Sequence, residues 1–308
     1  MEDLQENPTT CLPGDENGGL FNAIVDPKSK DNSAIFPLDG VELDDVLDDK
    51  LIELLEVAPI IYKIGGTTIV RLSQTLALKG GDNVLYSEAE TLRFIAMNLP
   101  DLRVPRVHRA FKVPDEATYF GARAYIVMDY IDGMNLGDCW KHLDSERRKD
   151  VVDQTAHIIC RLQSIEFPTS GALDNNTSPC RGHFFTDYSA GPFSSTSEME
   201  AWFNHKLEVS QGVNQAPKDI PPFRFSKFVL VHQDISPRNI VLDTSGNVWL
   251  LDWAYSGAYP PAFEAGALHA QMRFSEFNEM LLKRFDWDEG EVRQLNGIGY
   301  ALTCAAFA

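Results

Sequence analysis

One short segment, residues 231–252, constrains the fold of this chain more than any other. It begins with V-H-Q-D-I-S-P-R-N and ends with V-W-L-L-D. The turn-forming residues D-T-S-G separate two apolar, β-prone runs, a pattern that predicts a β-hairpin. With the turn at 244–246, Asn239 lies opposite Leu251, so the side chains of Asn239 and Asp252 lie at the same open end of the hairpin.

This hairpin would bring two side-chain oxygens together. Magnesium prefers such hard oxygen ligands and fills its other positions with water and substrate phosphates. Asp234 precedes Asn239 by five residues and can face the same cleft, where its carboxylate could accept a proton from an attacking hydroxyl. Asp234, Asn239 and Asp252 match the catalytic Asp, the Asn and the downstream Asp of the kinase template. An ordinary solvated loop is the alternative, but His232 and Trp253 beside these residues favour phosphoryl transfer.

The chain resembles the aminoglycoside phosphotransferase family, and within it a fungal branch that carries H-x-D-L-x-P-R-N-I and I-D-W-x-x-A-G-x-Y-P-x-x-x-E. The matching residues are His232, Asp234, Pro237, Arg238, Asn239, Ile240, Asp252, Trp253, Gly257, Tyr259, Pro260 and Glu264. Three positions depart from the pattern: Gln233 stands where a small residue is frequent, Ile235 replaces Leu, and Ser256 replaces Ala. The resemblance extends from about Ala58 to the C-terminus.

The resemblance implies an α+β, two-lobed protein-kinase-like fold. A small antiparallel β-sheet lobe with one helix would be followed by a larger, mainly helical lobe. A length of 308 residues agrees with two lobes. We predict an acidic N-terminal extension over residues 1–50, a nucleotide-binding lobe with its hinge over 51–132, and a catalytic and substrate-binding lobe over 133–308.

A lysine and a glutamate in the predicted small lobe are candidates for holding the nucleotide phosphates. Lys79 ends the third of three short β-prone runs between residues 58 and 79, and a helix is predicted from Ser87, with Glu90 in a capping box. Glu88 would lie on the apolar face of this helix and point inward, where it needs a cation. Lys79 is the nearest candidate, although a solvated lysine at a strand end is the alternative. Such a pair would orient the lysine towards the phosphates of ATP.

A buried strand is predicted from Arg123 to Ile131, where the sequence reads R-A-Y-I-V-M-D-Y-I. By resemblance this strand leads into the connection between the lobes. Met128 would flank the adenine, and the backbone of Asp129, Tyr130 and Ile131 would form hydrogen bonds with it. Met128 as a core residue is compatible with this role.

The resemblance also assigns roles to the remaining motif residues. Asp234 would be the catalytic base, Asn239 and Asp252 the magnesium ligands, and His232 a structural residue that braces the loop. Glu264 could contact a cationic acceptor, or it could be a carboxylate at a helix N-terminus.

The net charge of −18 is concentrated at the N-terminus. Residues 1–50 contain thirteen acidic residues and three lysines, a net charge of −10. We expect roughly the first forty residues to be loosely ordered or draped on the body, and residues 41–57 to form an amphipathic helix. Such acidity argues against nucleic-acid binding. The acidic larger lobe is compatible with a cationic substrate, and equally with ordinary solubility.

The sequence shows no membrane-spanning or secretory segment, so we expect a cytoplasmic protein without a membrane partner. Its five cysteines include no C-x-x-C pair, which fits a reducing compartment. The C-R-G-H cluster at 180–183 lacks a second Cys/His pair, so no zinc site is predicted. Residues 167–195 are rich in Gly, Pro, Ser and Asn and predict a long surface loop that could close over a substrate.

These observations predict a small-molecule phosphotransferase that moves the γ-phosphate of ATP to a substrate hydroxyl. A protein substrate is disfavoured because Gln233 precedes Asp234, and because Tyr259 and two prolines leave no room for a long activation loop after Asp252. Two alternatives remain: a non-catalytic protein that binds a nucleotide or metabolite, and an enzyme of this fold that performs non-phosphoryl chemistry in a biosynthetic pathway.

Overall fold

The computed structural model describes residues 23–307, which divide into two compact units. One unit contains the residues up to Tyr86 together with Val107–Tyr130, and the other contains Ser87–Arg106 and the residues from Ile131 onward. The second unit therefore includes a helix that the predicted boundaries place in the small lobe. It does so because the segment after this helix bonds to the second unit: the backbone N–H of Leu250 donates to Arg103 O at 3.2 Å.

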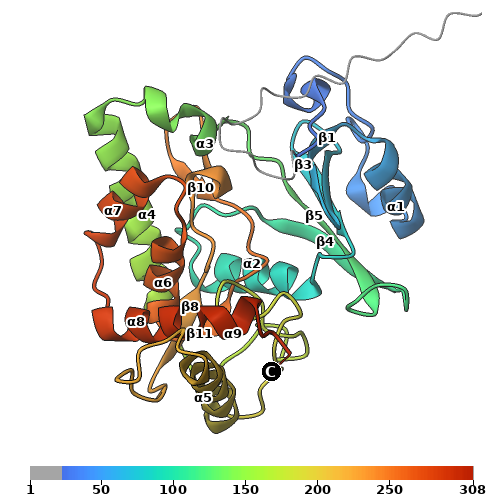
Figure 1. The fold of residues 1–308 in the computed structure, drawn as a ribbon. Helices are drawn as coiled ribbons and strands as arrows, with labels where there is room; N and C mark the ends of the chain where they lie inside the picture. Colours follow the sequence, from blue (N-terminus) through green and yellow to red (C-terminus); the bar gives the residue numbers. More distant parts are fainter. Residues whose placement is uncertain (1–22, 308) are drawn as a thin grey trace, which may run out of the picture. The chain divides into compact units, whose positions relative to one another are not determined.

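The first unit is built on an antiparallel sheet with the strand order β1-β2-β3-β5-β4 (Figure 1). Its strands are β1 (Ile60–Ile64), β2 (Thr67–Arg71), β3 (Leu76–Gly81), β4 (Val107–Pro114) and β5 (Ala122–Asp129). The predicted β-meander is thus confirmed. The sequence did not reveal β4, whose residues are only partly buried or exposed because it is an edge strand.

Helix α1 (Asp48–Val57) packs on this sheet. Its buried residues Leu51, Leu54 and Leu55 recur at helical spacing and join a hydrophobic cluster with residues of β2, β3 and β5. The helix is shorter than the predicted 41–57 because the chain before it forms the 3-10 turn η2 (Leu43–Asp45) and is extended at its N-cap, Leu47.

Residues 24–39 form a strap along the same unit, which includes the 3-10 turn η1 (Pro27–Lys30). Leu38 N donates to Leu72 O at 2.8 Å, and the buried Arg71 donates to Ser29 O at 2.9 Å. The Arg71 guanidinium also lies 3.8 Å from the ring centroid of Tyr130. The described part of the predicted extension is therefore packed on the sheet, and residues 1–22 lie outside the described residues.

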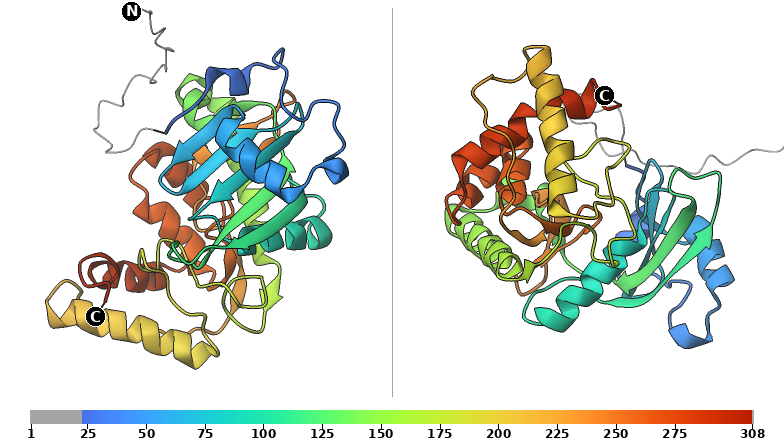
Figure 2. Two further views of the ribbon diagram at one scale, coloured as in Figure 1. Left: turned by 90° about the vertical axis from the view of Figure 1, so that its right-hand side faces the viewer. Right: turned by 90° about the horizontal axis from the view of Figure 1, so that it is seen from below.

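The second unit is mainly helical. Its helices are α2 (Tyr86–Asn98, which begins at the last residue of the first unit), α3 (Leu136–Cys139), η3 (Trp140–His142), α4 (Ser145–Gln163), α5 (Thr196–Gly212), η4 (Pro237–Asn239), α6 (Ala262–Ala270), α7 (Ser275–Leu282), α8 (Glu289–Gly297) and α9 (Gly299–Thr303). Helix α5 packs alongside α9 (Figure 2). Within residues 23–307, none of the helices has the length and apolar character needed to cross a membrane.

Two small antiparallel sheets lie within this unit, one in the order β10-β9-β6 and one in the order β11-β8-β7. Their strands are β6 (Met134–Asn135), β7 (Glu166–Phe167), β8 (Phe228–Val231), β9 (Ile240–Leu242), β10 (Val248–Leu250) and β11 (Gly257–Tyr259). Strands β8 and β11 pack with α5 and α6 in one hydrophobic cluster. This cluster fixes β8, which enters the loop at 232–236, and β11, which follows the hairpin of β9 and β10.

The segment 167–195 is only in part a surface loop. Cys180 pairs with Ala190 as an isolated β-bridge, and Gly171 pairs in the same way with Ala258 of β11. Phe184 and Phe185 are buried in the core of the second unit. The predicted loop is therefore present and many of its residues are exposed, but a few aromatic residues anchor part of it in the core, which its Gly-, Pro- and Ser-rich composition did not indicate.

Candidate functional site

The predicted hairpin is present and has the predicted register. Strands β9 and β10 pair with Leu250 opposite Ile240, and Leu251 N donates to Asn239 O at 2.8 Å. The Asp243 carboxylate fixes the turn by accepting from the backbone and side chain of Asn247 and from Trp249 Nε1. Burial opposes the ionisation of Asp243, but these hydrogen bonds lower its pKa to about 2. The turn therefore fixes the register of the two strands. This register places Asn239 and Asp252 at the other, open end of the hairpin.

The Asp234 carboxylate is buried and held on both oxygens. Its Oδ1 accepts from Arg238 Nη2 at 2.8 Å, and its Oδ2 accepts from Asn239 Nδ2 at 2.9 Å. Burial and the charge of Asp252 oppose its ionisation, yet His183 and Arg238 lower the pKa of Asp234 below its ordinary value. The group is therefore a fixed, ionised carboxylate, and its position, more than its basicity, suits it to receive a proton.

His232 is fully buried and binds the loop on both sides of its ring. Its Nδ1 accepts from Asp234 N at 3.1 Å, so the ring hydrogen is on Nε2, which faces Leu251 O at 3.0 Å. The ring also packs edge-to-face against Trp253, with the centroids 4.6 Å apart. His232 thus joins the start of the loop at 232–236, which would be the catalytic loop, to the end of β10, and this is compatible with the bracing role expected for it.

Glu264 lies in the first turn of α6 and is almost completely buried. Its two carboxylate oxygens accept from the backbone N–H groups of His232, at 2.6 Å, and of Gln233, at 3.2 Å. Burial raises the pKa of Glu264 to about 7, against the opposing effect of these two bonds. The suggested contact with a cationic acceptor is therefore wrong for this structure, because both oxygens are used to hold the catalytic loop.

Asn239 and Asp252 are the residues that could hold magnesium. The amide nitrogen of Asn239 bonds to Asp234, which leaves its Oδ1 for a cation, and Asp252 is exposed with a φ of 60°. A non-glycine residue in this left-handed region is often held there at a functional site. Among residues 23–307 no group of three or more His, Cys, Asp or Glu is arranged to bind a metal. An amide oxygen and one carboxylate fit magnesium, which takes few protein ligands when phosphates supply the rest.

Two positively charged or titratable side chains near Asp234 were not predicted as site residues. Arg238 forms an ion pair with Asp234, which lies four residues earlier in the sequence. This spacing could have indicated the pair. His183 lies 3.7 Å from Asp234 Oδ1, measured from its Nε2. It is 51 residues away in sequence, and no periodicity or motif indicates this proximity.

Lys79 lies in the middle of the sheet of the first unit. It is buried on β3, opposite Ile69 of β2 and Ile126 of β5. Gly65 and Gly66 form the two-residue turn between β1 and β2, so they are an ordinary hairpin turn and not a phosphate-covering loop. The lysine thus lies on the predicted third strand, but inside it and not at its end, because the strand continues to Gly81.

Glu88 lies on the buried face of α2, as predicted. It belongs to the second unit and Lys79 to the first, so their ion pair stays a prediction. The predicted capping box is wrong: the helix begins at Tyr86, which places Ser87 inside it, and Glu90 bonds to Arg93 at 2.5 Å.

The proposed adenine-binding segment begins at the end of β5. Met128 lies half-buried between Ala77 of β3 and Val107 of β4. Tyr130 N donates to Thr75 O at 2.8 Å, so this backbone donor extends the pairing with the β3 side and does not serve a base. Adenine binding by the backbone groups of Asp129 and Ile131 stays a prediction.

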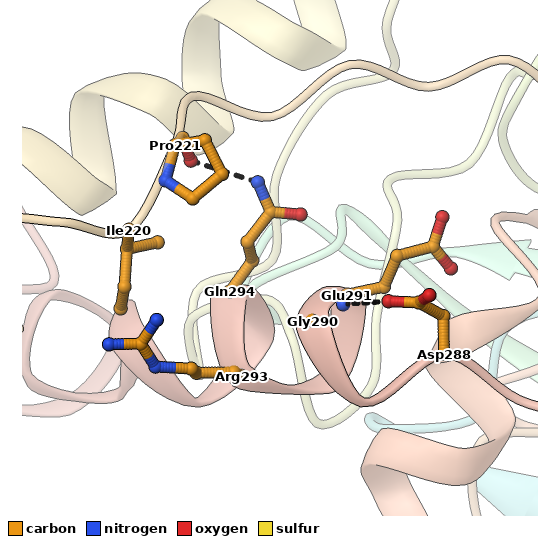
Figure 3. A pocket seen from close by; sticks show the side chains of 7 residues that line it. All are labelled: Ile220, Pro221, Asp288, Gly290, Glu291, Arg293 and Gln294. Carbon is orange, nitrogen blue, oxygen red and sulfur yellow. Dashed lines mark hydrogen bonds between the residues drawn. The ribbon is translucent and has the colours of Figure 1, made fainter.

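A surface hollow elsewhere in the second unit is not the candidate site (Figure 3). It lies between the segment around Pro221 and the start of α8. Its polar groups dock and cap this helix: Gln294 Nε2 donates to Pro221 O, and Asp288 Oδ1 accepts from Glu291 N. Because none of its lining residues belongs to the catalytic loop or the hairpin, we assign no chemistry to it.

Comparisons with known proteins show the family and the fold of this chain. A family model described as a phosphotransferase enzyme family matches residues 63–295. The streptomycin–ATP–APH(2″)-IIa ternary complex is 16% identical, with a TM-score of 0.52, and the match covers 83% of this chain and 87% of that one. The GDP and kanamycin complex of APH(2″)-IIia is 11% identical, with a TM-score of 0.54, and the match covers 83% of this chain and 84% of that one.

A third structure, the aminoglycoside phosphotransferase APH(2″)-Ib with ADP bound, is 15% identical, with a TM-score of 0.51 and coverage of 82% and 86%. These likenesses confirm the predicted α+β, kinase-like fold. The comparison with curated proteins gives no match.

Proposed function

The chain belongs to the phosphotransferase enzyme family, and on that premise we propose that it transfers the γ-phosphoryl group of ATP to a hydroxyl group of a small molecule. The observation that carries this proposal is the state of Asp234. Its carboxylate is buried and ionised, and Arg238 and Asn239 fix both of its oxygens. It therefore has the properties of a positioned general base.

In the proposed reaction, the acceptor hydroxyl gives its proton to the Asp234 carboxylate. The acceptor oxygen forms a bond to the γ-phosphorus, and the bond between that phosphorus and the β–γ bridging oxygen breaks, which leaves ADP. Magnesium held by Asn239 Oδ1 and the Asp252 carboxylate would supply positive charge to the phosphate oxygens. His232 and Glu264 keep the catalytic loop in place throughout, since both bond to its backbone.

Residues outside the catalytic loop complete the proposal for ATP. We expect Lys79 to hold the phosphates and Glu88 to orient this lysine. Met128 and the backbone of Asp129 and Ile131 would bind the adenine. The position of Lys79 in the centre of a five-stranded sheet supports this assignment, because a rigid sheet limits the movement of its ammonium group.

The acceptor is proposed to be a hydroxylated small molecule in the cytoplasm. Amino sugars are the first candidates, because two of the related structures are complexes with streptomycin and with kanamycin. The acidic charge of the chain is compatible with such cations. Amino alcohols and neutral hydroxylated natural products belong in the same test, since the carboxylate of Asp234 acts on the hydroxyl alone.

Acceptor-dependent ADP release tests the proposed function. The purified chain is incubated with ATP and magnesium and with kanamycin, streptomycin, choline, glycerol and hydroxylated natural products in turn. ADP release that requires one of these compounds is the expected result. Stabilisation by magnesium–ATP without any release would indicate a non-catalytic binding protein, and no nucleotide effect at all would indicate non-phosphoryl chemistry.

Removing the carboxylate of Asp252 is expected to weaken magnesium binding. Asp252→Asn should raise the magnesium concentration needed for half-maximal ATP turnover about tenfold or more, because a neutral amide is a weaker ligand than a carboxylate. A magnesium titration of initial rates measures this change. Asp286→Asn makes the same substitution at an exposed position far along the chain and should leave the titration unchanged. Equal magnesium dependence in both variants would contradict the assignment.

A further inference from the structure

His183 lies in a short closed loop of the second unit. The β-bridge between Cys180 and Ala190 closes this loop, with backbone N–O distances of 2.8 and 3.1 Å. The residues that follow His183, Phe184 and Phe185, are buried, and Phe184 packs against Phe263 of α6 with the ring centroids 4.9 Å apart. The position of His183 is therefore set by the core and not by a mobile loop.

Gln233 holds the other side of the same loop. Its Nε2 donates to Arg181 O at 3.2 Å and to Tyr255 O at 2.8 Å, so it ties the loop to the segment that follows β10. Gly182 has a φ of 132°, and a Cβ there would lie 2.5 Å from Gln233 Oε1. Only glycine allows so close an approach in this conformation. Gln233 and Gly182 thus form a clamp on this loop.

With the loop held in this way, the His183 side chain lies beside Asp234. Its ring lies edge-on to Tyr255, with the centroids 6.2 Å apart, and its Nε2 is 3.7 Å from Asp234 Oδ1. That distance is too long for a hydrogen bond. The Nε2 atom is itself buried, and no hydrogen-bond partner for it exists among residues 23–307. A buried polar nitrogen without a partner is costly unless something binds it, and here it lies beside the catalytic carboxylate.

We propose that His183 binds the acceptor hydroxyl next to Asp234 and orients it for attack. An oxygen atom about 2.8 Å from both His183 Nε2 and Asp234 Oδ1 would lie to one side of the line that joins these two atoms, which are 3.7 Å apart. In that position the hydroxyl donates its hydrogen to Asp234 and accepts the N–H of His183 Nε2. One lone pair then remains for the γ-phosphorus, the proton passes to Asp234, and His183 keeps its own proton. This role rests on the proposed phosphotransfer.

Substitution of His183 tests this role. The acceptor is the compound from the ADP-release test that gives the highest kcat/KM. If none of those compounds is turned over, water serves as the acceptor and the rate of ATP hydrolysis is compared. His183→Ala should lower kcat/KM for the acceptor about 10- to 100-fold, the effect of one lost hydrogen bond to a reacting group. The KM for ATP and the thermal shift caused by magnesium–ATP should not change. His183→Gln keeps an N–H close to the position of Nε2 and should restore the rate to within about fivefold of the wild type.

The control is His205→Ala, which makes the same change at an exposed position on α5. Wild-type rates in both His183 variants would overturn the role of His183 and leave phosphotransfer standing. An equal loss in the Ala and Gln variants would also overturn it, because a purely structural histidine predicts that result. No ADP release by the wild type, with any probe or with water, would overturn the proposed function itself.

A substitution of Gln233 tests the same role without changing His183. Gln233→Glu replaces the NH2 group, which donates to the carbonyl groups of Arg181 and Tyr255, by one carboxylate oxygen that cannot donate, so the loop should lose its attachment. If Gln233 acts through His183, this change should lower the rate in the wild type and have little further effect in His183→Ala. Fully additive losses in the double variant would show that the clamp does not position His183.

Discussion

Asp234→Asn is expected to lower kcat about 1,000-fold while the affinity for magnesium–ATP stays within about twofold. The asparagine has nearly the same shape as the aspartate, and its amide oxygen can still accept from Arg238 or Asn239, the two side chains that hold the carboxylate. It cannot take a proton from the acceptor hydroxyl. The change therefore removes the proton acceptor and retains most of the packing around it. Single-turnover rates and an ATP-binding titration measure the two effects separately.

Two further variants make this test decisive. Asp234→Ala should be at least as inactive, and Asp286→Asn, at an exposed position, should keep wild-type kcat. A thermal unfolding curve for each variant excludes loss of folded protein as the cause. If Asp234→Asn keeps more than about a tenth of the wild-type kcat, Asp234 is not the general base, since general bases contribute far more than that.

The hairpin of the candidate site could be predicted because its determinants are local. The apolar runs of β9 and β10 and the turn between them fix the register, and the register alone places Asn239 beside Leu251. The burial of Glu88 follows from local periodicity in the same way. For this hairpin and this helix face the local amino-acid pattern was sufficient, whereas the capping box at Ser87 and the start of the helix predicted over 41–57 were wrong.

Contacts between distant residues were not predictable in this way. His183 approaches Asp234 because two aromatic residues and a β-bridge anchor its loop, and none of these leaves a periodic pattern. Arg71 is buried between Phe36 and Tyr130, and its partners come from a strap about forty residues earlier in the chain. Composition indicated a surface loop in the first segment and a loosely ordered or draped chain in the second, but it could not indicate the few long-range contacts that determine where they lie.

Glu264 shows the same limit for a motif residue. Its match to a motif position indicated that it matters, but motif spacing cannot tell a substrate contact from a bond to the backbone. The structure shows the second, since both oxygens face N–H groups of the catalytic loop. A buried carboxylate in this position has a consequence for stability that can be measured.

Glu264→Gln is expected to change the pH dependence of folding stability between about pH 4.5 and pH 7. The pKa of Glu264 rises from 4.5 to about 7 because burial disfavours its charged form. In this range the unfolded chain has released the proton and the folded chain has kept it, so the wild type loses stability as the pH rises. The loss attributable to this group should approach about 3 kcal/mol at pH 7 and stay constant above it. Glutamine does not titrate and should lack this loss.

Urea unfolding at a series of pH values measures the difference between the wild type and Glu264→Gln, in which the contributions of other carboxylates cancel. Glu279→Gln, at an exposed position on α7, should give a curve parallel to the wild type. Parallel curves for Glu264→Gln as well would mean that its two backbone bonds offset the burial completely. The expected slope instead means that part of the folding energy is spent on keeping a carboxylate beneath the catalytic loop. This loss of stability serves the enzyme only if the ionised carboxylate, which accepts from both N–H groups, is the form of Glu264 that holds the loop in place for catalysis.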